Sequence, residues 1–598
     1  MAKKFIDVMD TTFRDGFQSV FGGRVLMKDF FPAVEAAKTA GINHFEFGGG
    51  ARFQSLYFYL REDAFEMMDE FRKIVGPDAN LQTLARGVNT VMLDTGSKEL
   101  IDLHAKMFKK HGTTTIRNFD ALNDVENLKY SGERISHHGL KHEVVVTMMD
   151  LPPGCHGAHD VAFYEKTLRG ILDAGIPYDS ICFKDASGTS NPQKVFETIQ
   201  MARKLVPEGT HLRLHTHETA GVSVSAYMAA LEAGVDGIDM AAAPVSGGTS
   251  QPDILTMLHA TKGMNFDLGG LEIGKILTYE KELQNSLSDY FMPPEATMVS
   301  PVIPFSPMPG GALTANTQMM RDNDILDKFP EVIAAMQEVV EKGGYGTSVT
   351  PVSQFYFQQA LNNVMQGPWK AIAPGYGKMV LGYFGKTPVA PDPEVVKIAS
   401  EKLGLEPTTQ NALDIANADP EKSLENWINR LKEEDIEITE ENIFIAAACQ
   451  DKGIAFLKGD GELNVRKISE MKNDCEGSSM GSGSYTVVVD GQKFSVQVAE
   501  GDADIQVTAV NGESAAPAAA TPAAASGNEL EIKALLPGNV WKIVANPGQS
   551  VNEGDVIMIL ESMKMEIDVV APRGGVIKSI NVATNDKVVE GQVVAVLG

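Results

Sequence analysis

The 598-residue chain is poor in cysteine and in long apolar runs, and each shortage excludes a class of protein. Its 4 cysteines (Cys155, Cys182, Cys449 and Cys475) are widely spaced and form no Cys-x-x-Cys motif, so no disulfide scaffold is expected. No apolar run approaches the ~18 residues of a membrane-spanning helix, and the first residues lack the apolar core of a signal peptide. The sequence therefore predicts a cytoplasmic protein in a reducing compartment.

Basic residues are also scarce, with 52 Lys and Arg against 79 Asp and Glu, for a formal net charge of −27. Nucleic acids and anionic lipid surfaces do not attract such a chain, so neither is expected as its main partner. An anionic substrate is not excluded, because it responds to the charge of a local pocket. The composition, 43% apolar and 22% charged, is typical of globular proteins.

The first 245 residues alternate short apolar runs with amphipathic helical patterns, such as 29–39 and 223–232. Strands that alternate with helices indicate parallel β/α units. Eight such units in about 250 residues favour a closed (β/α)8 TIM barrel, with an open doubly wound sheet as the alternative. The eight predicted strands cover residues 5–10, 44–47, 81–84, 114–118, 144–149, 180–184, 212–217 and 237–242.

Composition divides the chain into four predicted segments. After the barrel the sequence reads mostly helical, and two strand-like runs then precede a linker, 515–526, of almost only Ala, Pro, Thr and Ser. This composition is typical of a semi-extended tether. The predicted segments are an α/β barrel domain (1–300), a helical part (301–475), a small β segment with the linker (476–528) and an all-β domain (529–598).

The last segment is an internal repeat, because Gly554 and Leu560 recur as Gly591 and Leu597 at a constant offset of 37 residues. Lys564 lies between the two copies, in Glu-Ser-Met-Lys-Met-Glu. A lysine in an exposed turn between symmetric halves is a delivery point for a carried group, although it could be one more solvated lysine. The segment resembles the biotinyl carrier domain, whose Met-Lys-Met lysine is biotinylated; the related lipoyl domain usually lacks the flanking methionines.

Two imidazoles, His215 and His217, stand at i and i+2 on the seventh predicted strand and so point the same way. At the C-terminal end of a barrel strand such a pair is a platform for a metal, although on a strand the pair is often incidental. The first predicted strand ends in a run of polar groups at 10–18 that a helix cap or turn does not explain. Because these residues lie at the mouth of a barrel, Asp15 is expected to join the two histidines at one ion.

The sixth predicted strand carries Lys184 at its inward end. A buried charged lysine without a partner costs several kcal/mol, so this amine is expected to be paired, deprotonated or modified. A salt bridge to a neighbouring carboxylate, such as Asp185, is the simplest alternative.

The motif Asp-Thr-Thr-x-Arg-Asp (10–15) with a strand His-x-His resembles a superfamily of metal-dependent barrels that handle enolates. Lys184-Asp185-x-x-Gly188 separates its carboxyltransferases from its aldol-type lyases. With Lys564, nearly all of the chain resembles the biotin-dependent carboxyltransferases, which include the pyruvate carboxylase B subunit and the oxaloacetate decarboxylase α subunit. The resemblance implies covalent biotin and a divalent metal, zinc or else manganese or cobalt, held by Asp15, carbamylated Lys184, His215 and His217.

The same resemblance assigns four further site residues. Arg86 matches the arginine that binds the substrate carboxylate, a task suited to the guanidinium fork. Gln18 matches a ligand of the keto-acid oxygen, and Arg14 supports the same site. Thr350 matches the threonine that passes a proton between biotin and substrate.

Three stretches depart from the family pattern and leave the identity of the keto acid open. The family pattern Trp-Gly-Gly-Ala-Thr-Phe is replaced in this chain by Phe-Gly-Gly-Gly-Ala-Arg-Phe at residues 47–53. The family pattern Glu-Asp-Pro-Trp is replaced by Glu-Asp-Ala-Phe at residues 62–65. The loop 152–160 replaces a shorter turn. Its Cys155, His156 and His159 could bind a metal, but we favour polar side chains at the barrel mouth.

The resemblance predicts a carboxyltransferase that moves a carboxyl group between carboxybiotin and pyruvate or oxaloacetate. No ATP-grasp-like glycine-rich loop is present, so the expected partner is a separate biotin carboxylase subunit, as in a two-subunit pyruvate carboxylase. The alternative is the oxaloacetate decarboxylase α subunit, with integral membrane partners and a sodium pump. Biotin protein ligase and a homodimer or higher oligomer are also expected. An aldol-type metallolyase and a non-catalytic biotin carrier are remote alternatives.

Overall fold

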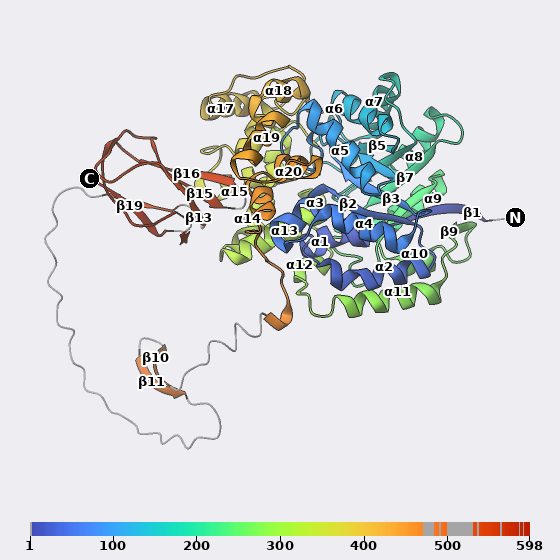
Figure 1. Ribbon diagram of the computed structural model, residues 1–598, viewed down its shortest axis with the longest axis horizontal. Helices are drawn as coiled ribbons and strands as arrows, with labels where there is room; N and C mark the ends of the chain where they lie inside the picture. The colour runs from blue at the N-terminus through green and yellow to red at the C-terminus, as the bar shows by residue number, and fades with distance from the viewer. Residues whose placement is uncertain are drawn as a thin grey trace. The chain divides into compact units, whose positions relative to one another are not determined.

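The computed structural model describes residues 3–470, 483–489, 492–498, 530–534, 538–562, 565–584, 586–589 and 591–598. It divides into two compact units, Met1–Val465 and Arg466–Gly598 (Figure 1). The predicted linker 515–526 and Lys564 lie outside the described residues. In the described part of the chain, no helix is both long and apolar enough to cross a membrane.

A closed parallel barrel forms the core of the first unit (Figure 1). Each strand pairs in parallel with the next, and β1 pairs with both β8 and β2, so the open-sheet alternative is wrong. All eight predicted strands are present, with bounds that differ by a few residues. Within residues 3–470 the barrel strands are β1 (Lys4–Asp10), β2 (His44–Gly49), β3 (Asn80–Ala85), β4 (Thr115–Asn118), β5 (Lys141–Thr147), β6 (Ser180–Asp185), β7 (His211–Thr216) and β8 (Gly237–Met240).

Amphipathic helices connect the strands and bury their apolar faces against the barrel. Polar side chains cap the N-termini of several of these helices. The Asn191 side chain, for example, accepts a hydrogen bond from the backbone N–H of Lys194, in a helix whose first residue is Pro192. A short strand, β9 (Phe266–Leu268), adds to β1 outside the closed ring. The helices are α1 (Phe17–Phe21), α2 (Met27–Thr39), α3 (Gly50–Ser55), α4 (Ala64–Val75), α5 (Lys98–Lys110), α6 (Glu126–His137), α7 (Val161–Asp173), α8 (Pro192–Leu205), α9 (Ser223–Ala233), α10 (Ile254–Ala260) and α11 (Ile273–Ser286).

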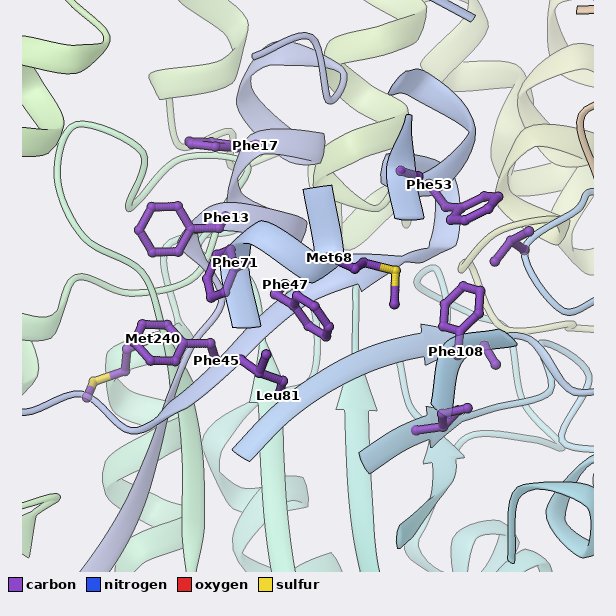
Figure 2. Packing of buried hydrophobic residues seen from close by; sticks show 14 of the residues in the cluster. Phe13, Phe17, Phe45, Phe47, Phe53, Met68, Phe71, Leu81, Phe108 and Met240 are labelled. Atoms are coloured by element: carbon purple, nitrogen blue, oxygen red, sulfur yellow. The ribbon is translucent and has the colours of Figure 1, made fainter. Parts of the chain in front are cut away.

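An aromatic cluster packs beside the polar motif that follows β1 (Figure 2). The ring of Phe13 lies 5.6 Å from that of Phe71 and 5.8 Å from that of Phe17, centroid to centroid, and both pairs meet edge to face. Phe47 extends the cluster to Phe71 at 5.4 Å. Edge-to-face packing of this kind stabilises a core beyond the area it buries. It holds the turn that carries Arg14 and Asp15 against β2 and α4.

The helical region that follows the barrel belongs to the same compact unit. Its last helix, α20, returns to the barrel, where Phe444 packs against Phe53 and Phe108 at centroid distances of 5.5 and 6.1 Å. The helices of this region are α12 (Pro294–Thr297), α13 (Gly310–Asp322), α14 (Phe329–Lys342), α15 (Val352–Gln366), α16 (Pro374–Val380), α17 (Pro393–Leu403), α18 (Ala412–Ala418), α19 (Leu424–Glu433) and α20 (Glu440–Leu457).

The second unit contains an antiparallel pair, β10 (Gly483–Val489) with β11 (Gln492–Val498), and the predicted all-β domain. Among its described residues the domain has two four-stranded sheets, in the orders β12-β19-β17-β14 and β16-β15-β13-β18. β13, β14 and β15 begin at residues 538, 550 and 556, and β17, β18 and β19 begin 37 residues later, at 575, 587 and 593. The sequence repeat is therefore a structural repeat. The strands are β12 (Leu530–Lys533), β13 (Gly538–Ile543), β14 (Ser550–Val551), β15 (Val556–Ser562), β16 (Met565–Val570), β17 (Gly575–Ile580), β18 (Lys587–Val588) and β19 (Val593–Leu597).

We predict that His104 makes the stability of the first unit depend on pH. Its ring lies 4.1 Å from that of Phe108 and 5.8 Å from that of Phe444, and burial lowers its pKa from 6.5 to about 3. Between these values the unfolded chain binds the proton and the folded chain does not, so stability falls as the pH drops below about 6.5, by up to about 1.4 kcal/mol per unit.

Between pH 7.5 and pH 5, the free energy of unfolding should therefore fall by about 2 kcal/mol less in His104→Leu than in the unmodified chain. The measurement is guanidinium denaturation of the full chain at both pH values. His156→Leu, at an exposed histidine, is the matched control and should leave the pH dependence unchanged. Equal losses in His104→Leu and the unmodified chain would contradict the prediction.

Candidate active site

Asp15, His215 and His217 converge at the mouth of the barrel. Asp15 Oδ2 lies 3.2 Å from Nε2 of each histidine, and the two Nε2 atoms lie 3.1 Å apart. β7 ends at Thr216, so His217 follows the strand directly, while Asp15 comes from the turn after β1. One carboxylate oxygen and two imidazole nitrogens at this spacing fit the donor set of a divalent metal. The structure thus brings together the three residues that the sequence placed at one ion.

Hydrogen bonds on the far side of each imidazole fix its orientation. Nδ1 of His215 lies 2.7 Å from Asp239 Oδ2, and Nδ1 of His217 lies 2.7 Å from the carbonyl oxygen of Thr249. Both partners accept, so each Nδ1 carries the proton and each Nε2 presents a lone pair to the cluster. Burial lowers the pKa of His215, which keeps its ring neutral and able to ligate.

Lys184, on β6, completes the cluster. Its Nζ lies 2.7 Å from His215 Nε2 and 3.7 Å from Asp15 Oδ2, and the residue is only 3% exposed. Burial lowers the pKa of this amine. A neutral lysine amine is nucleophilic, which is the state that modification by CO2 requires.

The alternative of a salt bridge to a neighbouring carboxylate is borne out with Asp15, at 3.7 Å, and not with Asp185. Both oxygens of Asp185 accept from the following turn, from the backbone N–H groups of Ser187, Gly188 and Ser190 at 3.0, 2.9 and 2.6 Å. Gly188 has a φ of +66°, and a Cβ there would lie 2.3 Å from the carbonyl oxygen of His217. Only glycine permits this close approach of the β6 turn to the end of β7.

A buried ionic network below the cluster was not predicted from the sequence. Asp239 on β8 contacts Arg117 Nη1 at 2.6 Å and Arg213 Nη1 at 2.9 Å, besides His215. Burial opposes ionisation of Asp239, but the two guanidinium groups hold its pKa well below its usual range. Charged residues inside short apolar strands were the available signal, since barrel interiors cannot hold them unpaired.

Arg14 and Gln18 lie beside the cluster. Arg14 Nη1 lies 3.0 Å from Asp15 Oδ1 and 3.5 Å from Gln18 Oε1, and Nη2 lies 2.6 Å from Glu46 Oε1. Burial would raise the pKa of Asp15, but the charges of Arg14 and Lys184 hold it well below its usual range. Asp15 therefore stays ionised and able to ligate at neutral pH.

Arg86 is 2% exposed and sits just after β3. Its Nη1 donates to the carbonyl oxygens of Val91 and Met92 at 2.7 and 3.0 Å, and its Nε has no hydrogen-bond partner among the described residues. Burial, and then repulsion from Arg14, lower its pKa to about 9, so it remains charged at neutral pH. A buried guanidinium with an unused donor is suited to an anionic group.

Thr350 is half-buried and lies two residues before the first residue of α15. The segment before Thr350 is hydrogen-bonded to the barrel through Thr347. The backbone N–H of Thr347 donates to Ala121 O at 2.7 Å, and Thr347 Oγ1 lies 2.8 Å from Thr147 Oγ1. Thr147 is the register partner of Lys184 across β5 and β6. Among the described residues no hydrogen bond joins Thr350 to the Asp15 cluster.

The loop 152–160 does not form a metal cluster in the described structure, where Asp15, His215 and His217 are the group that could hold an ion. His159 is buried, and its ring nitrogens lie 3.2 Å from the Tyr164 hydroxyl and 2.8 Å from Tyr345 O. His156 is exposed. The loop therefore ties the end of β5 to the segment that leads to Thr350.

Gln251 is the site residue that no sequence pattern indicated. It is fully buried in the loop after β8, and its side-chain amide lies 2.9 Å from Asp15 Oδ2 and 3.0 Å from His217 Nε2. A single glutamine in a Gly/Thr/Ser-rich loop carries no spacing that points to a metal site.

Comparisons with known proteins agree with this geometry. A family model described as "Conserved carboxylase domain" matches residues 303–502, and one described as "Biotin-requiring enzyme" matches 532–597. The chain is 28% identical over 580 residues to the pyruvate carboxylase B subunit of Methanocaldococcus jannaschii, and the match covers 94% of both chains. It is 31% identical over 420 residues to the methylmalonyl-CoA carboxyltransferase 5S subunit of Propionibacterium freudenreichii subsp. shermanii, over 70% of this chain and 81% of that one.

Among solved structures, the carboxyl transferase domain from Rhizobium etli pyruvate carboxylase superposes with a TM-score of 0.69 at 23% identity, covering 77% of this chain and 78% of that domain. At this identity the superposition establishes the fold. The relatives and the biotin domain confirm the resemblance first seen in the Asp-Thr-Thr-x-Arg-Asp and Met-Lys-Met motifs. The chain therefore belongs to the family of biotin-dependent carboxyltransferases that includes the pyruvate carboxylase B subunit.

Proposed function

We propose that this carboxyltransferase moves a carboxyl group between biotin on Lys564 and pyruvate, forming or consuming oxaloacetate, as the B subunit of a two-subunit pyruvate carboxylase. The observation that carries the proposal is the convergence of Asp15, Lys184, His215 and His217 in a chain that also has a biotin domain. The names of the relatives favour pyruvate carboxylase over the decarboxylase and over an aldol-type lyase.

Asp15, His215, His217 and carbamylated Lys184 would hold a divalent metal, of which zinc suits the donor set and manganese or cobalt are alternatives. When bound, the metal supplies a Lewis acid that polarises the keto oxygen and stabilises the enolate. For carbamylation the Lys184 ammonium first gives up one proton; the neutral nitrogen then forms a bond to the carbon of CO2 and loses a second proton, which leaves a carbamate anion. It replaces a cation beside Arg14 with an anion, which removes a buried repulsion.

The remaining site residues bind and orient the keto acid. The buried guanidinium of Arg86 receives the substrate carboxylate, which explains how a chain with a net charge of −27 attracts an anion. Gln18 contacts the keto oxygen from α1. Arg14 keeps Asp15 ionised and orients Gln18 through the contact at 3.5 Å.

Thr350 is proposed to carry the proton that must move between biotin and substrate when the carboxyl group is transferred. The bonds of Thr347 to Ala121 and Thr147 support this role, because they tie the segment before Thr350 to the strand ends that surround Lys184. A hydroxyl fits a short proton relay since it both donates and accepts.

A separate biotin carboxylase subunit would load the biotin, and a biotin protein ligase would attach it to Lys564. The predicted linker, residues 515–526, would raise the effective concentration of biotin at the barrel. We place the protein in the cytoplasm and expect it to work as a homodimer or higher oligomer.

Lys564→Arg should abolish biotin incorporation and carboxyl transfer together, because arginine keeps the charge but offers no amine to acylate. Streptavidin blotting and oxaloacetate formation measure the two losses. Lys542→Arg, at an exposed position on β13, is the matched control and should keep both. Biotin incorporation by Lys564→Arg would exclude this attachment site.

Thr350→Ala should lower carboxyl transfer by about 10²- to 10⁴-fold, the range lost with a general acid–base group. Biotin and metal content should stay unchanged, as measured by blotting and by atomic emission. Thr350→Ser keeps the hydroxyl and should restore most of the rate. Full activity in Thr350→Ala would rule out the proton relay.

Copurification should identify the partner. Streptavidin capture of the native biotinylated chain, followed by mass spectrometry, should recover an ATP-using biotin carboxylase chain. Recovery of integral membrane subunits instead would overturn the assignment in favour of the decarboxylase.

A further inference from the structure

Gln251 reaches into the centre of the Asp15–His215–His217 cluster from a segment that is bonded to the end of β7. The carbonyl oxygen of Thr249 receives the proton of His217 Nδ1, and that of Ser250 accepts from Glu218 N at 2.8 Å. The side chain of Gln251, 0% exposed, is thereby held between Asp15 and His217. One end of its amide faces the cluster and the other faces Thr11 and Ser250.

The hydrogen bonds of Thr11 restrict which end of the amide can face the cluster. Thr11 Oγ1 lies 2.9 Å from Met240 O and 2.7 Å from the nearer side-chain atom of Gln251. A threonine hydroxyl has one proton, and a backbone carbonyl oxygen only accepts. If the proton goes to Met240 O, the Gln251 atom facing Thr11 must be the NH2 group. The oxygen and nitrogen ends of an amide are assigned by such partners.

Each orientation of the amide therefore satisfies the hydrogen bonds at only one of its two ends. With the NH2 group toward the cluster, Gln251 donates to Asp15 and His217, but Thr11 faces two acceptors with one proton. With the oxygen toward the cluster, Thr11 is satisfied and the amide NH2 donates to Thr11 and Ser250. In that orientation the oxygen joins Asp15 Oδ2 and the Nε2 atoms of His215 and His217, which are all acceptors, and a cation among them would hold the four together.

We propose that Gln251 is a further metal-site residue, whose side-chain oxygen faces the divalent cation and serves as an additional oxygen donor beside Asp15, His215 and His217. The reorientation exchanges the donor contacts to Asp15 and His217 for donor contacts to Thr11 and Ser250. Because the amide is neutral, it adds an oxygen ligand without adding to the negative charge of the site. The inference rests on the metal role proposed above.

The test is a titration of the chelator-treated full chain with Mn²⁺, in which the EPR signal of free Mn²⁺ gives the dissociation constant. Gln251→Leu should weaken Mn²⁺ binding by about 10- to 100-fold, the range typical of lost metal-site partners. Gln251→Met keeps the unbranched chain and should weaken binding to a similar extent. Gln251→Glu keeps a side-chain oxygen at the end of a side chain of the same length. This variant should bind Mn²⁺ at least as tightly as the unmodified chain.

Gln193→Glu is the matched control, because it adds the same charge at an exposed position on α8, and it should leave the constant unchanged. Unchanged or tighter binding in Gln251→Leu and Gln251→Met would overturn the proposal. That result is expected if the Gln251 amide only donates to Asp15, because removal of the amide leaves the Asp15 carboxylate free to bind the metal. If the unmodified chain does not bind Mn²⁺ or Zn²⁺, the proposed metal site itself fails. Circular dichroism of both apolar variants establishes that they are folded.

Discussion

The pairing of Asp239 with Arg117, Arg213 and His215 is the constraint on which the rest of the site depends. Three strands, β4, β7 and β8, meet in these contacts, and all four side chains are fully buried in the barrel interior. Breaking a buried ion pair by removing one partner costs about 3–5 kcal/mol, so each charge requires the others. The network fixes the proton on His215 Nδ1 and so determines that Nε2 faces Asp15. The chemistry at the mouth is thus set by electrostatics one layer below it.

Charge works differently at the surface and at the site. The whole chain has a formal net charge of −27, which says little about a substrate. Within the mouth, Arg14 and Arg86 are 1% and 2% exposed and are not screened by solvent. Asp15 and Glu46 neutralise Arg14, whereas Arg86 donates only to backbone carbonyls among the described residues. Arg86 therefore carries a buried positive charge that no described carboxylate neutralises.

Much of the fold was predictable because it follows from local periodicity. All eight barrel strands are short apolar runs, and the 37-residue repeat became two matching sets of strands. Asp15, His215 and His217 were predictable for the same reason, because strand alternation and the position after β1 place them at one end of a barrel. Gln251 and Asp239 were missed because their contacts to the site come from residues far away in the chain.

The sequence by itself determined the barrel, the repeat domain, the family and the residue types in the Asp15–His215–His217 cluster. These rest on short-range patterns, in which each residue is compared with neighbours a few positions away. Only the tertiary structure decided that Lys184 faces His215 and not Asp185, and that Thr249 and Asp239 orient the two histidines. Those choices depend on which lone pair or proton a neighbouring strand presents within hydrogen-bond distance, and no spacing along the chain encodes that.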